Sequence, residues 1–170
     1  LHIHEGTGTV RISDAALRRR QYPWPAMPDV QTSDAVLNTL VRASVNTLNN
    51  SIHEVAVDGM GRERQQYSGD GSHQLHAVYL AFGETRLPGR FVTAFSQGIT
   101  EEGYFLDCWP AYDRLARLWE RQLRVSYWGP LVDHGVGFGF DCFHYYMYTG
   151  DRDGLAEAFP RLLRFFTYLR

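Results

Sequence analysis

The sequence has only two cysteines and almost no imbalance of charge. Cys108 and Cys142 are not in a C-x-x-C spacing, so neither a disulfide scaffold nor a thiolate metal site is indicated. We interpret both as reduced residues that pack in a core. Seventeen basic and nineteen acidic residues leave a formal charge of −2. Because this balance provides no positive field, we expect neither nucleic acid nor an anionic membrane as a partner.

Long apolar runs are also missing. No stretch approaches the ~20 apolar residues that a membrane helix needs, and the N-terminus lacks the basic-then-apolar layout of a signal peptide. The localisation therefore stays open between cytoplasmic and secreted. The sequence begins without methionine at "LHIHEG" and stops inside the apolar pattern of "RLLRFFTYLR". We expect it to be a segment of a longer polypeptide, whose remainder would be its partner.

The composition is that of a folded domain: 44% of the 170 residues are hydrophobic and 14% are aromatic, so disorder is not indicated. "LHIH" and "TVRIS" alternate in polarity and predict short strands, with "ALRRRQY" after them. Three prolines in "YPWPAMPDV" then predict an extended crossing. We assign residues 1–29 to the end of a preceding β-sandwich-like domain and a linker.

From residue 30 onward the pattern is helical. Ser33 and Asp34 offer N-cap chemistry to a first helix that ends near Asn49-Asn50, with an apolar face formed by Val36, Leu37, Leu40, Val41, Val45 and Leu48. Further helices are predicted in "HQLHAVYLAFG", capped by Asp70 or Ser72, and in "LPGRFVTAFSQG", "AYDRLARLWERQLRV", "VGFGFDCFHYYMYTGD" and "GLAEAFPRLLRFFTYLR". Polar turns between them predict successive αα-hairpins.

Two short motifs do not support cofactor or metal binding. "HGVGFGFD" spaces its glycines as G-x-G-x-G with no strand before it, so the context of a dinucleotide fingerprint is missing. His2 and His4 share one face of a predicted strand, but no third ligand lies nearby. We therefore predict no cofactor and no metal.

The segment "VDGMGRERQQYSGD", residues 57–70, concentrates charge in one short place. Asp58, Glu63 and Asp70 alternate with arginines there, and glycines permit tight backbone turns. A solvated turn with surface ion pairs is the generic interpretation of such a string. The residues around it favour a functional interpretation.

The segment resembles the D-x-x-x-R-E-R-x-x-W-x-G-D signature of the α-L-rhamnosidase family, glycosidases with a six-hairpin (α/α)6 barrel. "SDAVLNTLVRASVNTLNNSIHEVAVDG", "HQLHAVYLAFGE" and "YYMYTGDRDGLAEAFPRLLRFFTYL" are also similar to this family. The resemblance covers about residues 30–170 and implies an all-α fold, present here as the first part of a catalytic (α/α)6 barrel after a short β segment.

The resemblance implies a role for each matching position. Glu63 is expected to be the general acid, while Asp58, Arg62 and Asp70 bind rhamnose hydroxyls. Tyr67 stands where the family usually has tryptophan. The family's general base is a glutamate late in the barrel that this sequence does not reach, so it is not assigned. The implied reaction is inverting hydrolysis of terminal α-L-rhamnosides in a glycoside or polysaccharide.

The chemistry independently favours these residue types. Glycoside cleavage needs an acid that keeps its proton near neutral pH and delivers it to the leaving-group oxygen. Carboxylates such as Asp58 and Asp70 disfavour ionisation of Glu63, whereas Arg62 and Arg64 oppose this effect. We expect the carboxylates to prevail.

Aromatic and polar residues complete the candidate site. Tyr67, Trp109 and Trp128 could cover the apolar face of a deoxy-sugar, and each could instead belong to the core. Asp133 and His134 lie in "GPLVDHG", a predicted loop before a helix where substrate-binding residues are often mounted. Helix capping is an equal alternative for Asp133.

Two other functions stay open. Another six-hairpin glycosidase could act on a different deoxy-sugar, a pentose or a uronic acid, because an acid on a loop does not encode the sugar. The substitution of Tyr67 for tryptophan keeps this alternative open. A non-catalytic sugar-binding fragment is the second alternative, since a barrel of this kind needs about twelve helices and fewer are predicted here.

Overall fold

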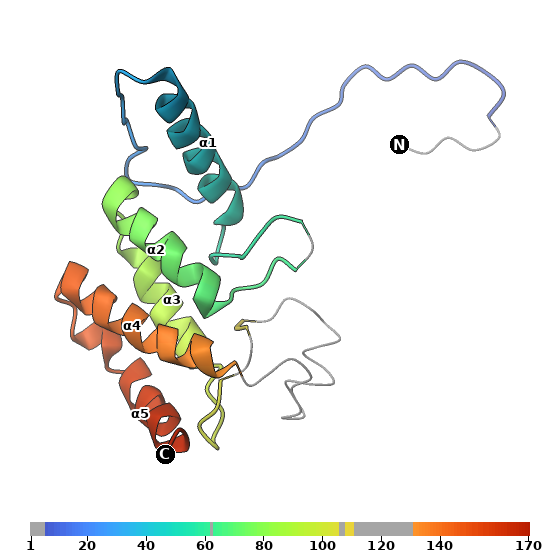
Figure 1. The fold of residues 1–170 in the computed structure, drawn as a ribbon. Coiled ribbons are helices and arrows are strands. Elements are labelled where there is room, and N and C mark those ends of the chain that lie inside the picture. Colours follow the sequence, from blue (N-terminus) through green and yellow to red (C-terminus); the bar gives the residue numbers. More distant parts are fainter. Residues whose placement is uncertain (1–5, 62, 106–107, 111–130) are drawn as a thin grey trace.

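The computed structural model describes residues 6–61, 63–105, 108–110 and 131–170. Within them the chain is all-α, with the helices α1 (Ala35–Ser51), α2 (Ser68–Phe82), α3 (Arg86–Ser96), α4 (Val132–Thr149) and α5 (Ala158–Tyr168) and a 3-10 turn, η2 (Asp153–Leu155). Figure 1 shows α2, α3, α4 and α5 below α1, with α3 behind α2 and α4 and with α5 lowest. The predicted all-α hairpin arrangement is confirmed, whereas the helix predicted over residues 111–125 lies outside the described residues.

The predicted short strands are wrong for residues 6–22, where the described chain is irregular and its side chains are almost all exposed. A strand needs a partner for its backbone groups, and two strands alone are marginal in water. The described part of the chain offers these residues no sheet; its two isolated bridges join Ile52 to Ala56 and Ile99 to Phe105. The domain boundary after residue 29 stays a prediction.

The proline-rich crossing is anchored by its aromatic residues. The indole Nε1 of Trp24 donates a 2.8 Å hydrogen bond to Asn49 Oδ1, and its ring lies 4.1 Å from that of Phe82 between centroids. Tyr22 is buried with Ile52 in the same small cluster. The linker thereby joins the end of α1 to the end of α2.

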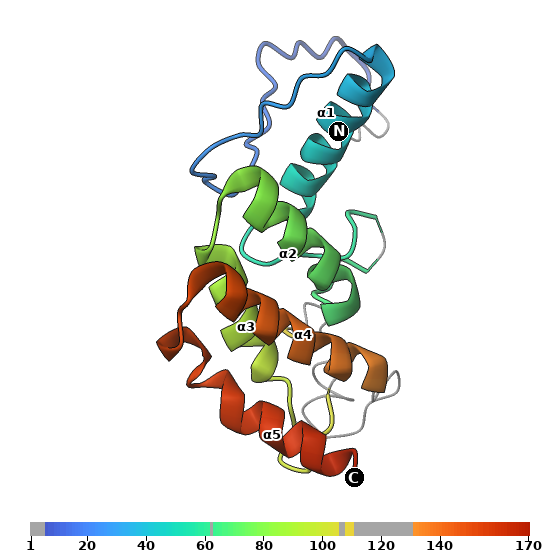
Figure 2. The ribbon, with the colours of Figure 1, turned by 60° about the vertical axis from the view of Figure 1, so that its left-hand side comes forward.

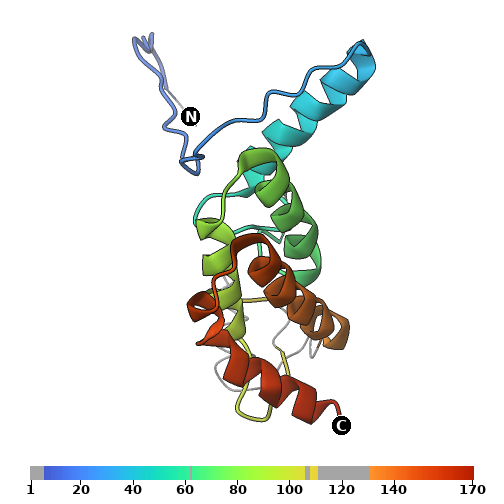
Figure 3. The same cartoon turned by 90° about the vertical axis from the view of Figure 1, so that its left-hand side faces the viewer.

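Helix α1 begins where the sequence predicts. Asp34 is its N-cap, and Oδ1 accepts hydrogen bonds from the backbone amides of Val36 and Leu37 at 2.7 and 3.2 Å. Its apolar face, however, is mostly uncovered, with Leu40 57% exposed. Figure 3 shows the reason, since α1 extends away from the other helices.

Three helix starts differ from the prediction. α5 begins at Ala158, after the 3-10 turn, rather than at Gly154, whereas α2 and α4 begin earlier than predicted. α2 begins at Ser68, so Asp70 and Ser72 lie inside the helix rather than capping it, and its end at Gly83 (φ 60°) is confirmed. α4 begins at Val132, four residues before the predicted "VGFGFD" start. Both helices extend N-terminally because their first turns pack against each other, a tertiary contact that local propensity does not encode.

Aromatic residues form the main core. Phe95 and Phe138 of α3 and α4 are fully buried and lie 5.2 Å apart between ring centroids. Phe105 packs edge-on against Phe165 of α5 at 4.8 Å. Cys142 belongs to the same cluster. Both cysteines are buried thiols, which confirms their interpretation as reduced residues of the interior. Figure 2 shows α3, α4 and α5, which carry most of these residues, lying next to one another.

The "YTGD" sequence forms the turn after α4. Gly150 takes the left-handed conformation (φ 67°) that ends the helix. The Tyr145 hydroxyl donates a 2.6 Å hydrogen bond to Asp151 Oδ2, and the Gly154 amide donates to Oδ1 at 2.8 Å. The motif is therefore explained by its role in reversing the chain into α5.

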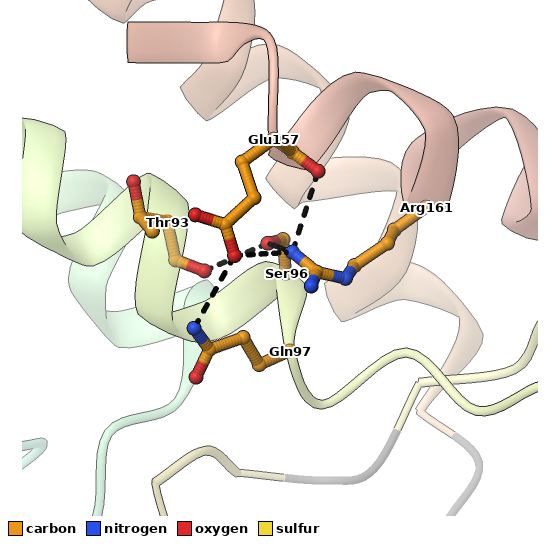
Figure 4. Close-up of polar contacts among 5 residues, drawn as sticks. All are labelled: Thr93, Ser96, Gln97, Glu157 and Arg161. Atoms are coloured by element: carbon orange, nitrogen blue, oxygen red, sulfur yellow. Dashed lines mark hydrogen bonds and ion pairs between the residues drawn. The ribbon is translucent and has the colours of Figure 1, made fainter.

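A polar network joins α3 to α5 (Figure 4). Arg161 Nη1 lies 2.9 Å from Glu157 Oε1 and donates to Ser96 Oγ at 3.2 Å. Ser96 Oγ donates to the Thr93 carbonyl at 2.7 Å, and Gln97 Nε2 reaches Glu157 at 3.5 Å. The Arg161–Ser96 and Gln97–Glu157 bonds cross between the two segments and so hold α5 along α3.

We expect Gly135→Ala to destabilise the fold and Gly137→Ala to be tolerated. A Cβ on Gly135 would contact the Phe165 ring and lie 2.6 Å from Phe105 Cδ2, whereas one on Gly137 would have 3.6 Å to Ser68 Oγ as its nearest contact. Overpacking costs about 1–3 kcal/mol, while alanine gains up to ~1 kcal/mol in a helix. Thermal unfolding of the two variants measures this. Equal melting temperatures would contradict the tight contact at Gly135.

Candidate active site

The site is built on residues 58–70, here called the signature segment. Its first and eighth residues pair across the backbone: the Asp58 amide donates to the Gln65 carbonyl at 2.9 Å, and the Gln65 amide donates to Asp58 Oδ1 at 2.8 Å. This pair closes residues 59–64, the acid loop, at its base. Asp58 is half-buried, and one of its carboxylate oxygens thus has a structural role.

Gln66 ties the base of the acid loop to two other segments. Its side chain is 1% exposed; Oε1 accepts from the Ala56 amide at 3.2 Å and Nε2 donates to the Trp109 carbonyl at 2.7 Å. The Trp109 amide in turn donates to the Gln66 carbonyl at 3.1 Å. Gln66 therefore holds the signature segment to residue 56 and to residue 109.

Glu63 lies in the acid loop with its side chain exposed. The next residue, Arg64, has φ 54°, and its Nε donates to the carbonyls of Met60 and Gly61 at 3.1 and 3.3 Å. Arg64 thereby folds the loop back on itself and directs its charge at carbonyl oxygens of its own loop. Arg62 lies outside the described residues.

The signature segment continues into α2 beside the start of α4. Ser68 Oγ donates a 2.7 Å hydrogen bond to the His134 carbonyl, and the Tyr67 ring meets the His134 ring edge-on, with 6.0 Å between centroids. A Cβ on Gly69 would lie 2.7 Å from His134 Nε2, so this close approach requires glycine. The structure thus brings together Tyr67 and His134, which are distant in sequence.

Asp70 and Asp133 occupy the first turns of α2 and α4, and both are exposed. Carboxylates there are stabilised by the helix dipole. The alternative that Asp133 caps α4 is wrong, because Leu131 holds the N-cap position. Both aspartates are therefore accessible at the end of the α2–α4 pair where Tyr67 and His134 meet.

The structure describes only one of the two tryptophans that were considered as sugar-binding residues. Trp109 is half-buried and packs against the aromatic core, and a Cβ on Gly98 would lie 2.8 Å from Trp109 Cβ. Its contacts are those of a packing residue next to the signature segment. Trp128 lies outside the described residues.

Some contributing residues were not identified from the sequence. Gln65 and Gln66 looked like solvated loop residues but are 6% and 1% exposed. Asp141 of α4 is 3% exposed and, among the described residues, its Oδ2 has no hydrogen-bond partner. Burial raises the pKa of Asp141 to about 7, partly offset by the Ser72 hydroxyl. Asp141 lies three residues after Phe138 and four before Tyr145, so the helical periodicity of the sequence places it on the same face as these core residues.

Nothing in the described ranges indicates a metal site, since no group of three histidine, cysteine or acidic residues is arranged to hold an ion there. The same part of the chain contains no helix with the length and apolar character needed to cross a membrane. The nitrogen Nδ1 of His134 is buried and lacks a hydrogen-bond partner within the described residues.

Comparison with known proteins identifies the family. Residues 26–170 match the family model described as the bacterial alpha-L-rhamnosidase 6 hairpin glycosidase domain. A GH78-family rhamnosidase of Bacillus sp. GL1 has a similar fold, with a TM-score of 0.72 and 21% identity over 87% of this chain and 14% of that chain. A rhamnosidase from Klebsiella oxytoca, solved with rhamnose bound, gives a TM-score of 0.62 and 22% identity over 86% of this chain and 26% of that chain. Among curated proteins, no match was found.

We expect Asp141→Asn to remove a pH-dependent loss of stability. Because the folded-state pKa is raised to about 7 by burial, the carboxyl's contribution is complete below its unfolded-state value near 3.9 and is lost as the pH rises through 7. Unfolding of both proteins between pH 5 and 9 tests this. The variant should gain on the order of 1–4 kcal/mol relative to the original at pH 9. Parallel stability curves would contradict it.

Proposed function

Because this chain belongs to the family of bacterial alpha-L-rhamnosidase 6 hairpin glycosidase domains, we propose that it contributes the general acid of an inverting α-L-rhamnosidase. The substrate class is a glycoside or polysaccharide with terminal α-L-rhamnose. The chain spans 14% and 26% of the two solved rhamnosidases that it resembles. The proposed activity therefore refers to the complete protein that contains this sequence.

The closure of the acid loop supports this proposal most strongly. Glu63 lies in the loop that the Asp58–Gln65 pair closes, and α2 starts shortly after that pair. The Glu63 residue itself is exposed. A general acid must come within hydrogen-bond reach of the leaving-group oxygen, about 2.6–3.2 Å. An exposed carboxyl on an anchored loop meets this requirement, and bound sugar would remove water from around it.

Polar and aromatic residues of the signature segment and of the start of α4 would bind the sugar. We assign hydroxyl binding to Asp70 and to the Asp58 oxygen that does not bond Gln65, and ring contact to Tyr67. Asp133 and His134 lie at the same end of the α2–α4 pair and extend the polar surface. Arg62 and Trp128 keep the substrate-binding roles proposed from the signature and the sequence. The general base would be a second carboxylate roughly 6.5–9.5 Å from Glu63, with the attacking water between them.

We expect Glu63→Gln in the complete protein to slow hydrolysis of alkyl or sugar rhamnosides by about 10² to 10⁴-fold. Glutamine keeps the shape of the side chain but cannot deliver a proton. A nitrophenyl rhamnoside should lose much less, because nitrophenolate departs without protonation. Asp70→Asn is the matched control; it should slow both substrates to a similar degree, because hydroxyl contacts do not depend on the leaving group. Values of kcat/KM on both substrates measure this.

Two results would contradict the assignment. An equal loss on both substrates for Glu63→Gln would leave Glu63 as a sugar-binding group. Titration with rhamnose that shows binding, with no hydrolysis of any glycoside by the unsubstituted protein, would support a non-catalytic sugar-binding role. Faster hydrolysis of pentosides or uronides than of rhamnosides would favour a different six-hairpin glycosidase.

We also expect the first-formed product to be the β-anomer of L-rhamnose. Inversion follows from attack of water on the face opposite the leaving group, which requires the wide separation of the two carboxyls. Proton NMR during the first minutes of hydrolysis distinguishes the anomers before they interconvert. An initial α-anomer would instead require a carboxylate nucleophile about 5–5.5 Å from Glu63.

A further inference from the structure

We propose that Gln66 is a positioning residue for Glu63, and that its buried amide sets where the acid loop presents the carboxyl. The inference rests on the proposed function of Glu63. It concerns a residue that does not face solvent, because the Gln66 side chain is 1% exposed. Its action would therefore pass through the backbone rather than through contact with the sugar.

Both ends of the Gln66 amide bond backbone groups from distant segments. Oε1 accepts from the Ala56 amide at 3.2 Å, and Nε2 donates to the Trp109 carbonyl at 2.7 Å. With the main-chain bond from Trp109 to the Gln66 carbonyl, one residue connects three parts of the chain. Two of these, residues 56 and 66, flank the acid loop.

No apolar side chain can replace these bonds. A leucine of similar size would leave the Ala56 N–H without its acceptor and the Trp109 carbonyl without its donor inside the protein. Such unsatisfied buried groups are costly, so the segments would move to find new partners or water. The Asp58–Gln65 pair lies next to Gln66 in the chain, so this movement would be transmitted to the base of the acid loop.

A small movement of the acid loop would affect catalysis selectively. Misplacement of a reacting group by about 1 Å can cost ~10²-fold, but the loss falls on the step that the group performs. A misplaced Glu63 would impair protonation of poor leaving groups and spare nitrophenolate. General unfolding would instead reduce the amount of active protein and lower both rates equally.

The experiment compares the ratio of kcat/KM for an alkyl rhamnoside and a nitrophenyl rhamnoside in the complete protein. For Gln66→Leu we expect the alkyl rate to fall about tenfold more than the nitrophenyl rate. Gln97→Leu is the matched control: its side chain reaches Glu157 between α3 and α5, away from the acid loop. It should leave the ratio unchanged.

Gln66→Glu provides a second variant that differs little in shape. When protonated, its carboxyl can still accept from Ala56 and donate to Trp109, whereas the ionised form repels the Trp109 carbonyl. The ratio of kcat/KM for the alkyl and nitrophenyl rhamnosides is compared with that of the unsubstituted protein at each pH. As the pH falls, the ratio of the variant should approach that of the unsubstituted protein. This recovery would not follow from a merely structural role.

The outcomes separate this inference from the proposed function. The positioning role alone would be overturned if Glu63→Gln showed leaving-group dependence while Gln66→Leu lost the same activity on both substrates. It would also be overturned if the ratio for Gln66→Glu matched that of the unsubstituted protein at every pH. Absence of leaving-group dependence in Glu63→Gln itself would overturn the proposed function. A changed ratio in both Gln66→Leu and Glu63→Gln supports both.

Discussion

The pairing of Asp58 with Gln65 is the constraint on which the candidate site depends. Two hydrogen bonds between these residues, one of them to a carboxylate, close a loop rich in glycine and charge. Without closure, a loop of this composition would have many conformations, and placing a catalytic carboxyl would cost conformational entropy during binding. Because the loop is closed in the folded protein, this conformational entropy is lost during folding and not during ligand binding.

The helices provide the frame for this loop. α2 starts directly after the signature segment and packs against α4, and the bond from Ser68 to the His134 carbonyl joins their first turns. The aromatic core then links α4 to α3 and α5. Glu63 can thus be exposed while the base of its loop is held, a combination that suits an acid that must meet a ligand.

The parts of the fold that could be predicted from the sequence depend on local chemistry. Asp34 as the cap of α1 and Gly83 as the end of α2 follow from side-chain and backbone preferences that act within a few residues. The signature spacing likewise identified Glu63, Asp58 and Asp70 as neighbours in one segment. These features need no knowledge of the tertiary structure.

The parts that could not be predicted depend on contacts between distant segments. The first turns of α2 and α4 form because they meet, and the predicted strands before residue 22 do not form in the described chain, which offers them no sheet. The sequence around Gln66 does not distinguish a solvated side chain from one that is bonded to Ala56 and Trp109. Burial of a polar side chain is decided by partners far along the chain, so its role is visible only in the structure.

The proposed function depends on the claim that an anchored loop presents Glu63 to the leaving-group oxygen. A crystal structure of the complete protein with an unreactive rhamnoside bound would test it most directly. We expect a Glu63 carboxyl oxygen about 2.6–3.2 Å from the glycosidic oxygen, with the Asp58–Gln65 and Gln66–Trp109 bonds intact. A different carboxyl at that oxygen, with Glu63 directed away from the sugar, would contradict the claim.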